Sequence, residues 1–480
     1  TTLCLCLELF LFERKVSMSY SDYVQAAKIG KKDYQSKLMA GESPTLEVLD
    51  DILHTTKSYR EVSLGLVQIP LAQVVGTKTA GRSNSFSSNF MPILDPNSEF
   101  ASKWMTLSTA QQEEGITDPI IAYEYMNKFY VLEGNKRVSV LKYYDAVSVM
   151  GQVTRILPKK TDDYDVKLYY EFVDFYSLSE INYLYFSKLG SFEKLQTVVG
   201  KKPGEVWSHN ERIDFRSLFL TFQSKYDEIG GENLKEITCG DAFLAFTQLY
   251  GYKELLEMSD SELTKLINSN FSEFELMSDT EVDLRMTAST KKASVLTKLL
   301  TPGAKHLKVA FIYEKTSASS AWTYSHELGR LHLNEVFPDD VTTVYYDSIN
   351  SHNIEEAIDD AIANGCNVIF TTSPTFSQAS LKAAIANPKI TILNCSLHDP
   401  HTSMRTYYAR MHEAKFIMGA VAGSMAAHDK IVYIADYPIY GTIANINSFA
   451  QGVKMTNPRA KIHLLWSCLK DVDVEEQIKQ

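Results

Sequence analysis

Residues 130–146 read YVLEGNKRVSVLKYYDA, a segment that changes from strand to helix around a single glycine. The first residues alternate polar and apolar side chains as a strand does, and the later apolar residues follow helical spacing. Gly134 lies at the junction, where a glycine lets the backbone approach a ligand closely. The N–H groups at a helix start attract anions, and Lys136 and Arg137 add positive charge. Spacing alone leaves two interpretations open, a phosphate-binding turn and a plain glycine turn with solvated cations.

Residues 67–158 resemble the ParB/sulfiredoxin-type domain, whose nucleotide-binding box opens a helix with the pattern Gly-x-Arg/Lys-Arg. In this chain the box consists of Gly134, Asn135, Lys136 and Arg137. The preceding GITDPIIAYEYMNKFYVLEG fits the family's pattern, in which an apolar strand pairs through a turn at Met126-Asn127 with the strand before the box. The segment VQIPLAQVVGTKTAGRSNSF is similar to the family's first strand and loop, and places the family's early arginine at Arg82. The resemblance implies an α+β domain that binds a nucleotide, CTP or ATP.

The box departs from the family at Asn135-Lys136, where chromosome-partitioning members usually carry Glu-Arg. A lysine meets phosphate as a point charge and lacks the fork geometry of arginine, which argues against tight nucleotide hydrolysis. The box has no cysteine, which argues against a sulfinic-acid reductase of the sulfiredoxin type. Glu133 is the only adjacent acid, so a nucleotide hydrolase or nuclease ranks third among our functional hypotheses. Whether the chain is an enzyme stays open, with a non-enzyme favoured and no catalytic residue assigned.

The C-terminal part of the chain alternates short apolar β-rich runs with helical segments. The predicted strands are KVAFIY from 308, TTVYYDS from 342, CNVIFTT from 366, KITILNC from 389, KIVYIADY from 430 and KIHLLWS from 461. Nearly continuous apolar strands separated by helices predict a parallel sheet covered on both faces. Ligands of such sheets bind beyond the carboxyl ends of the strands. The residues that follow these strands, at 317–322, 372–376, 394–396 and 436–441, are therefore the candidate site.

Small polar and aromatic side chains dominate these four segments. An aromatic ring can stack on a flat ligand, and Ser, Thr and Asn can hydrogen bond to its edge. The same residue types also cap helices, so a structural role is open for each one taken singly. Together they favour a neutral polar ligand with a planar part.

Residues 307–467 resemble the basic membrane protein (PnrA-like) family of nucleoside-binding proteins, which have a doubly wound type I periplasmic-binding fold. The motifs are Trp322 with HELGR at 326–330, ARMHEAKFIMGAVAGSMA from 409 and KIVYIADYPIYGTIANINSFAQGVK from 430. The resemblance places a purine-stacking aromatic at Trp322. The nucleoside-binding residues it implies are Trp322, Thr323, Thr372, Phe376, Asn394, Tyr437 and Pro438. Ala318-Ser319 and Thr323 replace an Asp pair and an Asn of typical members, which leaves the exact nucleoside open.

The two ends of the chain lead to further expectations. A two-lobed binding domain of this class fills roughly 300 residues, so we expect the domain at 307–480 to be truncated. The apolar run TTLCLCLELFLF is too short to span a bilayer and has no basic residues before it. We therefore expect residues 1–17 to be upstream read-through before Met18, and 18–66 to be a helical segment.

Residues 159–300 read as a helical connector, with predicted helices ending at Gly190 and Gly200 and a third opening after Pro203. The spacing resembles the helix-turn-helix of chromosome-partitioning proteins, but few cations lie on the third helix, which favours a structural bundle. The net charge of −11 argues against a broad DNA-binding surface. The Ser/Thr-rich segment 278–292 is the best linker.

Cysteine and histidine spacing points to neither a disulfide framework nor a zinc site. The six cysteines contain no Cys-x-x-Cys pair. His398 and His401 share a loop, but two imidazoles with no further ligand make a weak metal site. We expect ordinary buried thiols at Cys366 and Cys395 and no bound metal.

Three functional hypotheses follow. The first is a cytosolic sensor, in which a nucleoside bound by the C-terminal domain biases the ParB-like domain. The second is the substrate-binding component of a nucleoside ABC importer, membrane-associated or at the cell surface and partnered by a permease. The third is the nucleotide hydrolase or nuclease. Each hypothesis allows a homodimer, because ParB-like domains commonly dimerise. The net charge does not support DNA as a partner.

Overall fold

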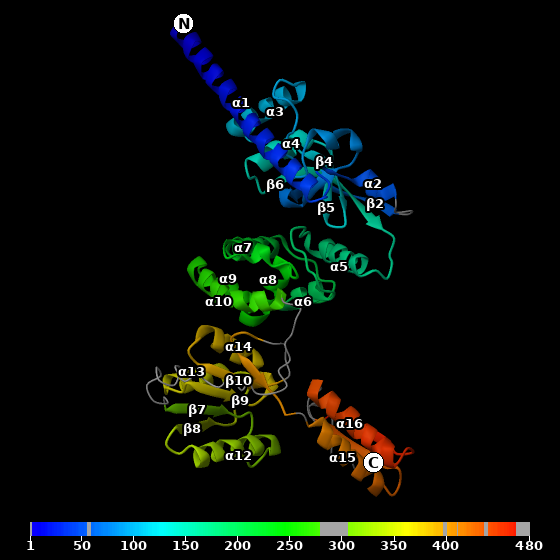
Figure 1. Cartoon of the computed structure of the whole chain (residues 1–480), viewed down its shortest axis with the longest axis vertical. Helices are drawn as coiled ribbons and strands as arrows, with labels where there is room; N and C mark the ends of the chain where they lie inside the picture. The colour runs from blue at the N-terminus through cyan, green and yellow to red at the C-terminus, as the bar shows by residue number, and fades with distance from the viewer. Residues whose placement is uncertain are drawn as a thin grey trace. The chain divides into compact units, whose positions relative to one another are not determined.

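The computed structural model describes residues 2–54, 59–278, 306–396, 401–409, 411–435 and 440–466, with side chains from Ser19 onward except at positions 59, 82, 321 and 440. The chain divides into an N-terminal unit, Thr1–Ser217 with Thr238–Leu244, and a C-terminal unit, Leu218–Ile237 with Ala245–Gln480 (Figure 1). Beyond residue 278, the predicted linker at 278–292 lies outside the described residues, as do the predicted pocket residues Tyr437 and Pro438 and the loop histidine His398.

The N-terminal unit is built on a six-stranded mixed sheet in the order β1-β3-β5-β4-β6-β2. Its strands are β1 (Glu47–Val48), β2 (Tyr59–Pro70), β3 (Val74–Thr77), β4 (Ile120–Tyr125), β5 (Lys128–Glu133) and β6 (Ser148–Pro158). Strands β4 and β5 pair antiparallel through the predicted turn at Met126 and Asn127. These two residues have φ of 50° and 64°, a geometry whose twist matches that of the flanking strands. The predicted pairing of these two strands is confirmed.

Helices of this unit pack on the sheet or on one another through aromatic and aliphatic side chains. They are α1 (Thr2–Met39), α2 (Leu49–His54), α3 (Glu99–Glu113) and α4 (Asn135–Tyr143). Tyr23 of α1 packs edge-on against Trp104 of α3, with ring centroids 5.4 Å apart. The predicted helical segment 18–66 is wrong in its second half, because α1 ends at Met39 and β2 pairs with β6 from residue 59 onward. The sheet domain therefore begins before residue 67.

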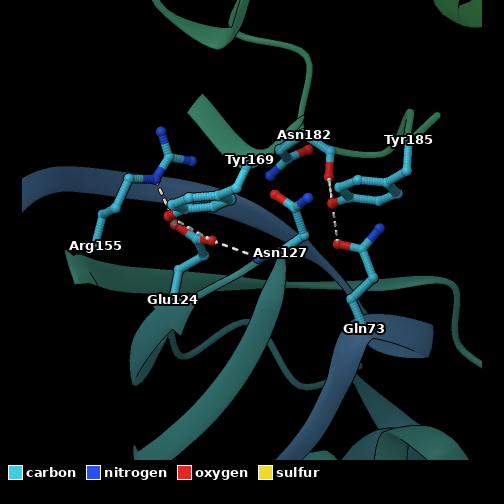
Figure 2. A network of polar contacts seen from close by, with 7 residues as sticks. All are labelled: Gln73, Glu124, Asn127, Arg155, Tyr169, Asn182 and Tyr185. Atoms are coloured by element: carbon cyan, nitrogen blue, oxygen red, sulfur yellow. Dashed lines mark hydrogen bonds and ion pairs between the residues drawn. The ribbon is translucent and has the colours of Figure 1, made fainter. Parts of the chain in front are cut away.

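A buried polar network ties helix α5 (Tyr164–Ser179) to this sheet (Figure 2). The Glu124 carboxylate, on β4, pairs with the Arg155 guanidinium on β6, and their side chains are 1% and 4% exposed. The Tyr169 hydroxyl lies 3.0 Å from one Glu124 oxygen, and the Asn127 backbone N–H donates to the other at 2.8 Å. Arg155 also lies over the Tyr176 ring, 4.4 Å from its centroid. A buried charge is tolerated only when it is paired and hydrogen bonded, and this network supplies both conditions.

The helical connector contains α5, α6 (Ser191–Val198), α7 (His209–Glu228), α8 (Cys239–Tyr250), α9 (Tyr252–Glu257) and α10 (Asp260–Ser278). The helix predicted to end at Gly190 is wrong, because α5 ends at Ser179 and residues 180–190 are not helical. Cations near the start of α7 are paired within the protein: Lys201 contacts Glu211 at 2.7 Å, and Arg212 pairs with Glu180. These pairs favour the structural-bundle interpretation over a DNA-reading helix.

The C-terminal unit contains a five-stranded parallel sheet in the order β11-β10-β9-β7-β8. Its strands are β7 (Leu307–Ile312), β8 (Val341–Tyr346), β9 (Val368–Thr371), β10 (Thr391–Cys395) and β11 (Arg405–Tyr407). The first four coincide with predicted strands, so the parallel sheet is confirmed. Strand β11 was not predicted, since three residues carry too little periodicity to be recognised.

Helices cover both faces of the parallel sheet, as predicted. Helices α13 (Ile354–Ala363) and α14 (Ser377–Ala386) pack on the face that carries Ala310 and Ile312. Helix α12 (Ala321–Val336) packs on the opposite face, where Leu333 meets Phe311. Alternate residues of β7 thus point to different helices, which is the pattern of a strand buried on both sides.

The remaining predicted strands, β12 (Lys430–Ala435) and β13 (Lys461–Trp466), form a separate two-stranded parallel sheet. Helices α15 (His412–Met425) and α16 (Tyr440–Thr456) pack closely beside each other. A Cβ added at Gly419 would lie 2.0 Å from the Phe449 carbonyl oxygen, and one at Gly452 equally close to that of Phe416. Glycine at these positions is required by the close backbone approach.

Candidate functional site

The carboxyl edge of the parallel sheet brings together most of the predicted ligand-binding residues that are described. Helix α12 begins there, and the Ser320 hydroxyl caps it by accepting from the Thr323 N–H at 3.2 Å. The cap fixes the first turn of α12 at the edge, because it satisfies a backbone donor that the helix leaves unpaired. Trp322 lies in this turn.

The Trp322 indole is oriented by the neighbouring strand. Its Nε1–H donates to the Thr372 carbonyl oxygen at 2.7 Å, just beyond β9. The residue is nevertheless 44% exposed. A large aromatic ring is thus held in one orientation and still presents surface to solvent, which suits stacking on a flat ligand.

Polar side chains at the ends of the neighbouring strands are buried and make hydrogen bonds. The Thr372 hydroxyl donates to the Ile312 carbonyl at 2.9 Å, linking the ends of β7 and β9. Asn394, at the end of β10, donates to the Thr371 hydroxyl at 2.9 Å and to the Ser373 carbonyl at 3.0 Å. These side chains hold the strand ends together. The sequence-predicted residues Thr323, Thr372 and Asn394 therefore lie at one edge of the sheet, and the Thr372 backbone carbonyl holds the indole there.

Two further aromatic side chains, which the sequence analysis missed, complete the edge. Tyr408 follows strand β11, and its ring centroid lies 6.4 Å from that of Trp322. His326, one turn along α12, lies 5.2 Å from Trp322, and its Nδ1 contacts the Trp322 carbonyl at 3.0 Å. Because a carbonyl only accepts, Nδ1 carries the proton, and burial lowers the pKa of His326 and favours its neutral form. The run RTYY at 405–408 carried one usable signal, its two adjacent tyrosines.

The acidic and basic side chains of the HELGR motif are structural in this structure. Arg330 donates from Nε to Glu327 at 2.8 Å, and the Tyr313 hydroxyl donates to the same carboxylate at 2.9 Å. The Arg330 hydrogen bonds hold the pKa of Glu327 below its usual value. The Arg330 guanidinium also lies 5.0 Å from the centre of the Tyr345 ring. This cluster fixes α12 on the sheet.

Phe376 does not join the open edge. It lies in the short helix η4 (Pro374–Phe376), is completely buried and belongs to the core between the sheet and helices α13 and α14. Its ring has no exposed surface on which a ligand could stack. Residues Tyr437 and Pro438 lie outside the described part of the chain, so their pocket role stays a prediction.

In the N-terminal unit, the predicted phosphate-binding box opens helix α4. Gly134 has φ of 107°, and a Cβ there would lie 2.6 Å from the Ile120 side chain, so only glycine fits. The Lys136 ammonium lies over the Phe100 ring at 4.8 Å, and Arg137 donates to the Pro119 carbonyl at 2.7 Å. The predicted phosphate-binding role of these cations stays a prediction, and they already have contacts within the protein.

Asn135 and Arg82 complete the predicted box. Asn135 is 7% exposed, and its Oδ1 has no hydrogen-bond partner among the described residues. Arg82 lies in the short helix η2 (Ala80–Ser85), and its side chain is outside the described residues.

A separate hollow of about 600 Å³ lies in the N-terminal unit, and helix α4 lines part of it. Its residues are Ile29, Leu71, Ala72, Asn89, Met91, Lys142, Tyr143, Asp145 and Ala146. Lys142 donates to the Val74 carbonyl at 2.8 Å, and burial lowers its pKa to about 8. The Lys142 ammonium also contacts the Phe90 ring. These two contacts within the protein explain the buried position of the side chain.

The part of the chain that the structure describes can be examined for a metal centre and for a membrane-spanning helix. Within it, no group of three or more His, Cys, Asp or Glu side chains is placed to hold a metal ion. No described helix is long and apolar enough to cross a bilayer.

Comparison with known proteins locates the similarity in the C-terminal part. Residues 306–476 match the family model described as ABC transporter substrate-binding protein PnrA-like. A purine-binding protein of Brucella abortus is 29% identical over 169 residues, which cover 34% of this chain and 48% of that protein. A protein of Haloferax volcanii, named as an ABC transporter glucose-binding protein, is 22% identical over 160 residues, 33% of this chain and 41% of the relative. The chain thus spans about half the length of the curated relatives it matches.

Solved structures give weaker similarities. A solute-binding protein of an ABC transporter system from Conexibacter woesei has a TM-score of 0.29 and 17% identity, covering 36% of this chain and 58% of that one. A Caulobacter myo-inositol binding protein has a TM-score of 0.27 and 18% identity, covering 35% and 57%.

The family model covers residues 306–476, which include the parallel sheet and the open edge beyond it, and does not include residues 67–158. The predicted ParB/sulfiredoxin resemblance is therefore not shown by these comparisons. The resemblance of the C-terminal segment to PnrA-like ABC transporter substrate-binding proteins is confirmed.

Proposed function

We propose that the C-terminal segment binds a small polar ligand with a planar ring, most simply a purine base or nucleoside, at the edge formed by Trp322 and Tyr408. The observation that carries this proposal is the Trp322 indole, which is fixed by its hydrogen bond to the Thr372 carbonyl and is still 44% exposed. The similarity to a purine-binding protein of Brucella abortus supports a purine as the ligand.

The chemistry of the edge suits a neutral ring system. Two aromatic rings, Trp322 and Tyr408, offer stacking surface, and His326 beside them is held in its neutral form, so it adds a polar ring without a charge. Stacking of a base on an aromatic side chain contributes about 1–3 kcal/mol. A sugar is the competing ligand, because the Haloferax volcanii relative is named for glucose binding.

Titration calorimetry of the full chain with adenine, adenosine, guanosine and glucose tests the ligand. We expect purine binding that weakens about 10- to 100-fold in Trp322→Ala. Trp322→Phe keeps a stacking ring and should lose less purine affinity than Trp322→Ala. Tyr324→Ala is the matched control, since Tyr324 is on the same helix and is 54% exposed. Binding of glucose alone, or equal purine affinity in Trp322→Ala and Tyr324→Ala, would contradict the purine site.

For the whole protein we propose the role of substrate-binding component of an ABC importer, which the similarities support better than the sensor. The support comes from the family model and both curated relatives. The importer hypothesis predicts a form associated with a permease at the membrane, and fractionation of cells that make the natural protein tests it. Recovery only in the cytosol, with no association with a permease, would favour the sensor.

The sensor hypothesis has its own test. It predicts that a purine changes amide hydrogen exchange around residues 120–143 and the affinity for CTP or ATP, because linked sites affect each other reciprocally. Unchanged exchange and unchanged nucleotide affinity in the purine-saturated protein would remove this hypothesis. Full nucleotide turnover in Arg137→Ala would likewise remove the predicted box as a catalytic centre.

A further inference from the structure

Helix α10 contributes a carboxylate to the loop that precedes strand β11. The Glu273 carboxylate accepts from the backbone N–H groups of Thr402 and Ser403, at 3.1 Å and 2.8 Å, and from the Thr402 hydroxyl at 2.6 Å. Its second oxygen lies 3.2 Å from Nδ1 of His401. These residues all belong to the C-terminal unit. One side chain thus holds three consecutive residues of the loop.

The Glu273 side chain is placed to make strong hydrogen bonds. The residue is only 8% exposed. Burial by itself would raise its pKa, but hydrogen bonds from His401, Thr402 and Ser403 outweigh that effect and lower the pKa to about 2. The carboxylate is therefore ionised at neutral pH, and hydrogen bonds to an ionised acceptor are about twice as strong as neutral ones.

The hydrogen bonds from residues 401–403 to Glu273, here called the Glu273 clamp, lie directly before strand β11 and the ligand edge. Strand β11 has three residues and pairs with β10 alone, so its position depends on what holds its ends. Met404, between the clamp and the strand, is buried in the core. Tyr408, on the far side of the strand, faces Trp322. Fixing residues 401–403 therefore fixes the place from which Tyr408 reaches the indole.

Other contacts join the same helical region to the sheet. The Thr402 hydroxyl lies 3.1 Å from the Ser272 hydroxyl on α10, and Gln378 on α14 donates to the Gln248 carbonyl on α8. The Glu273 clamp is thus one of several contacts by which the end of the connector holds the ligand-binding sheet.

We propose that Glu273 is a positioning residue for the ligand edge, which holds residues 401–403 so that Tyr408 lies beside Trp322, and that ligand binding and the order of helix α10 are linked through this clamp. The inference rests on the proposed function, because it takes the Trp322 edge as the ligand site. Linkage makes the effect reciprocal: a ligand that orders Tyr408 also stabilises the docked α10.

The test compares full-length Glu273→Ala and Glu273→Gln with Glu275→Ala, an exposed glutamate two residues along the same helix. The first readout is amide hydrogen exchange without ligand. We expect exchange in residues 401–409 to accelerate by about tenfold or more in Glu273→Ala, because buried N–H groups lose their acceptor, while β9 is unchanged. Glu273→Gln keeps one acceptor oxygen and should give an intermediate rate. Equal rates in Glu273→Ala and Glu275→Ala would overturn the positioning role.

The second readout is purine binding in the same variants. We expect Glu273→Ala to weaken binding about fivefold or more, and a saturating purine to slow exchange in α10 of the parent chain but not of this variant. Unchanged affinity, or the same protection of α10 in the variant, would overturn the linkage. If the parent chain binds no purine, the proposed function and the linkage fail, whereas the ligand-free exchange still decides the placement of residues 401–409. If Glu273→Ala does not fold, the same comparisons are made with Glu273→Gln.

Discussion

Replacing Arg155 with methionine should destabilise the N-terminal unit by about 3–5 kcal/mol, the usual cost of removing one partner of a buried ion pair. Both side chains are almost inaccessible, at 4% exposed for Arg155 and 1% for Glu124. In Arg155→Met, the Glu124 carboxylate keeps its hydrogen bonds with the Tyr169 hydroxyl and the Asn127 N–H but loses the guanidinium that balances its charge. The contact of Arg155 with the Tyr176 ring, 4.4 Å from its centroid, is lost as well.

The double variant Glu124→Gln/Arg155→Met separates the cost of an unpaired charge from the cost of altered packing. Glutamine keeps an acceptor for the Tyr169 hydroxyl and carries no charge, so the double variant should be more stable than Arg155→Met alone. Lys103→Met is the control, because the Lys103–Glu99 pair is exposed and should contribute nothing measurable.

Native-state hydrogen exchange of the β4 and β6 peptides measures these differences within the N-terminal unit, where whole-chain unfolding would mix two units. The reasoning would be refuted if Arg155→Met lowered the free energy of unfolding of the N-terminal unit by less than about 1 kcal/mol. It would also be refuted if the loss in the double variant equalled the sum of the losses in Glu124→Gln and Arg155→Met.

Three further outcomes are expected. Gly134→Ala should destabilise the N-terminal unit by about 1–3 kcal/mol, because φ is 107° and the new Cβ would meet Ile120; an unchanged melting temperature would contradict this. The pKa of Glu273 is lowered from 4.5 to about 2, which corresponds to about 3 kcal/mol of the free energy of unfolding. This stabilisation is complete above pH 4.5 and is lost as the pH falls toward 2. Glu273→Gln should not show this loss of stability when it is titrated with acid. Burial raises the pKa of Cys395 to about 11, so iodoacetamide at pH 8 should leave it unmodified in the native protein, and labelling as fast as in urea would show that the thiol is accessible.

Local patterns were sufficient wherever an element carries its own signal. Six short apolar runs bounded by polar segments predicted strands β7, β8, β9, β10, β12 and β13, and each run lies at the strand that it predicted. The turn at Met126-Asn127 was expected from the family resemblance of residues 67–158, and β4 and β5 pair antiparallel across it. Strand β11 was missed, since three residues cannot show a period, and with it Tyr408 was left out of the candidate site.

Other predictions failed because they depend on what packs against a residue. Phe376 follows a strand, as the pocket prediction required, yet helices α13 and α14 enclose it in the core. Segment 18–66 has helical composition at its start, but pairing with β6 makes residues from 59 onward part of a strand. Tertiary contacts override local propensity in such cases.

By itself, the sequence determined the parallel sheet, the glycine at the start of α4 and the position of Trp322 at the head of a helix, because each follows from periodicity or from the conformational range of one residue type. Only the tertiary structure decided that the Trp322 indole is fixed by Thr372, that Tyr408 stands beside it and that Glu273 holds the loop before β11. Glu273 and His401 are separated by 128 residues in the sequence. Contacts of this kind leave no local pattern, because they arise only when separate elements are brought together by the burial of their apolar faces.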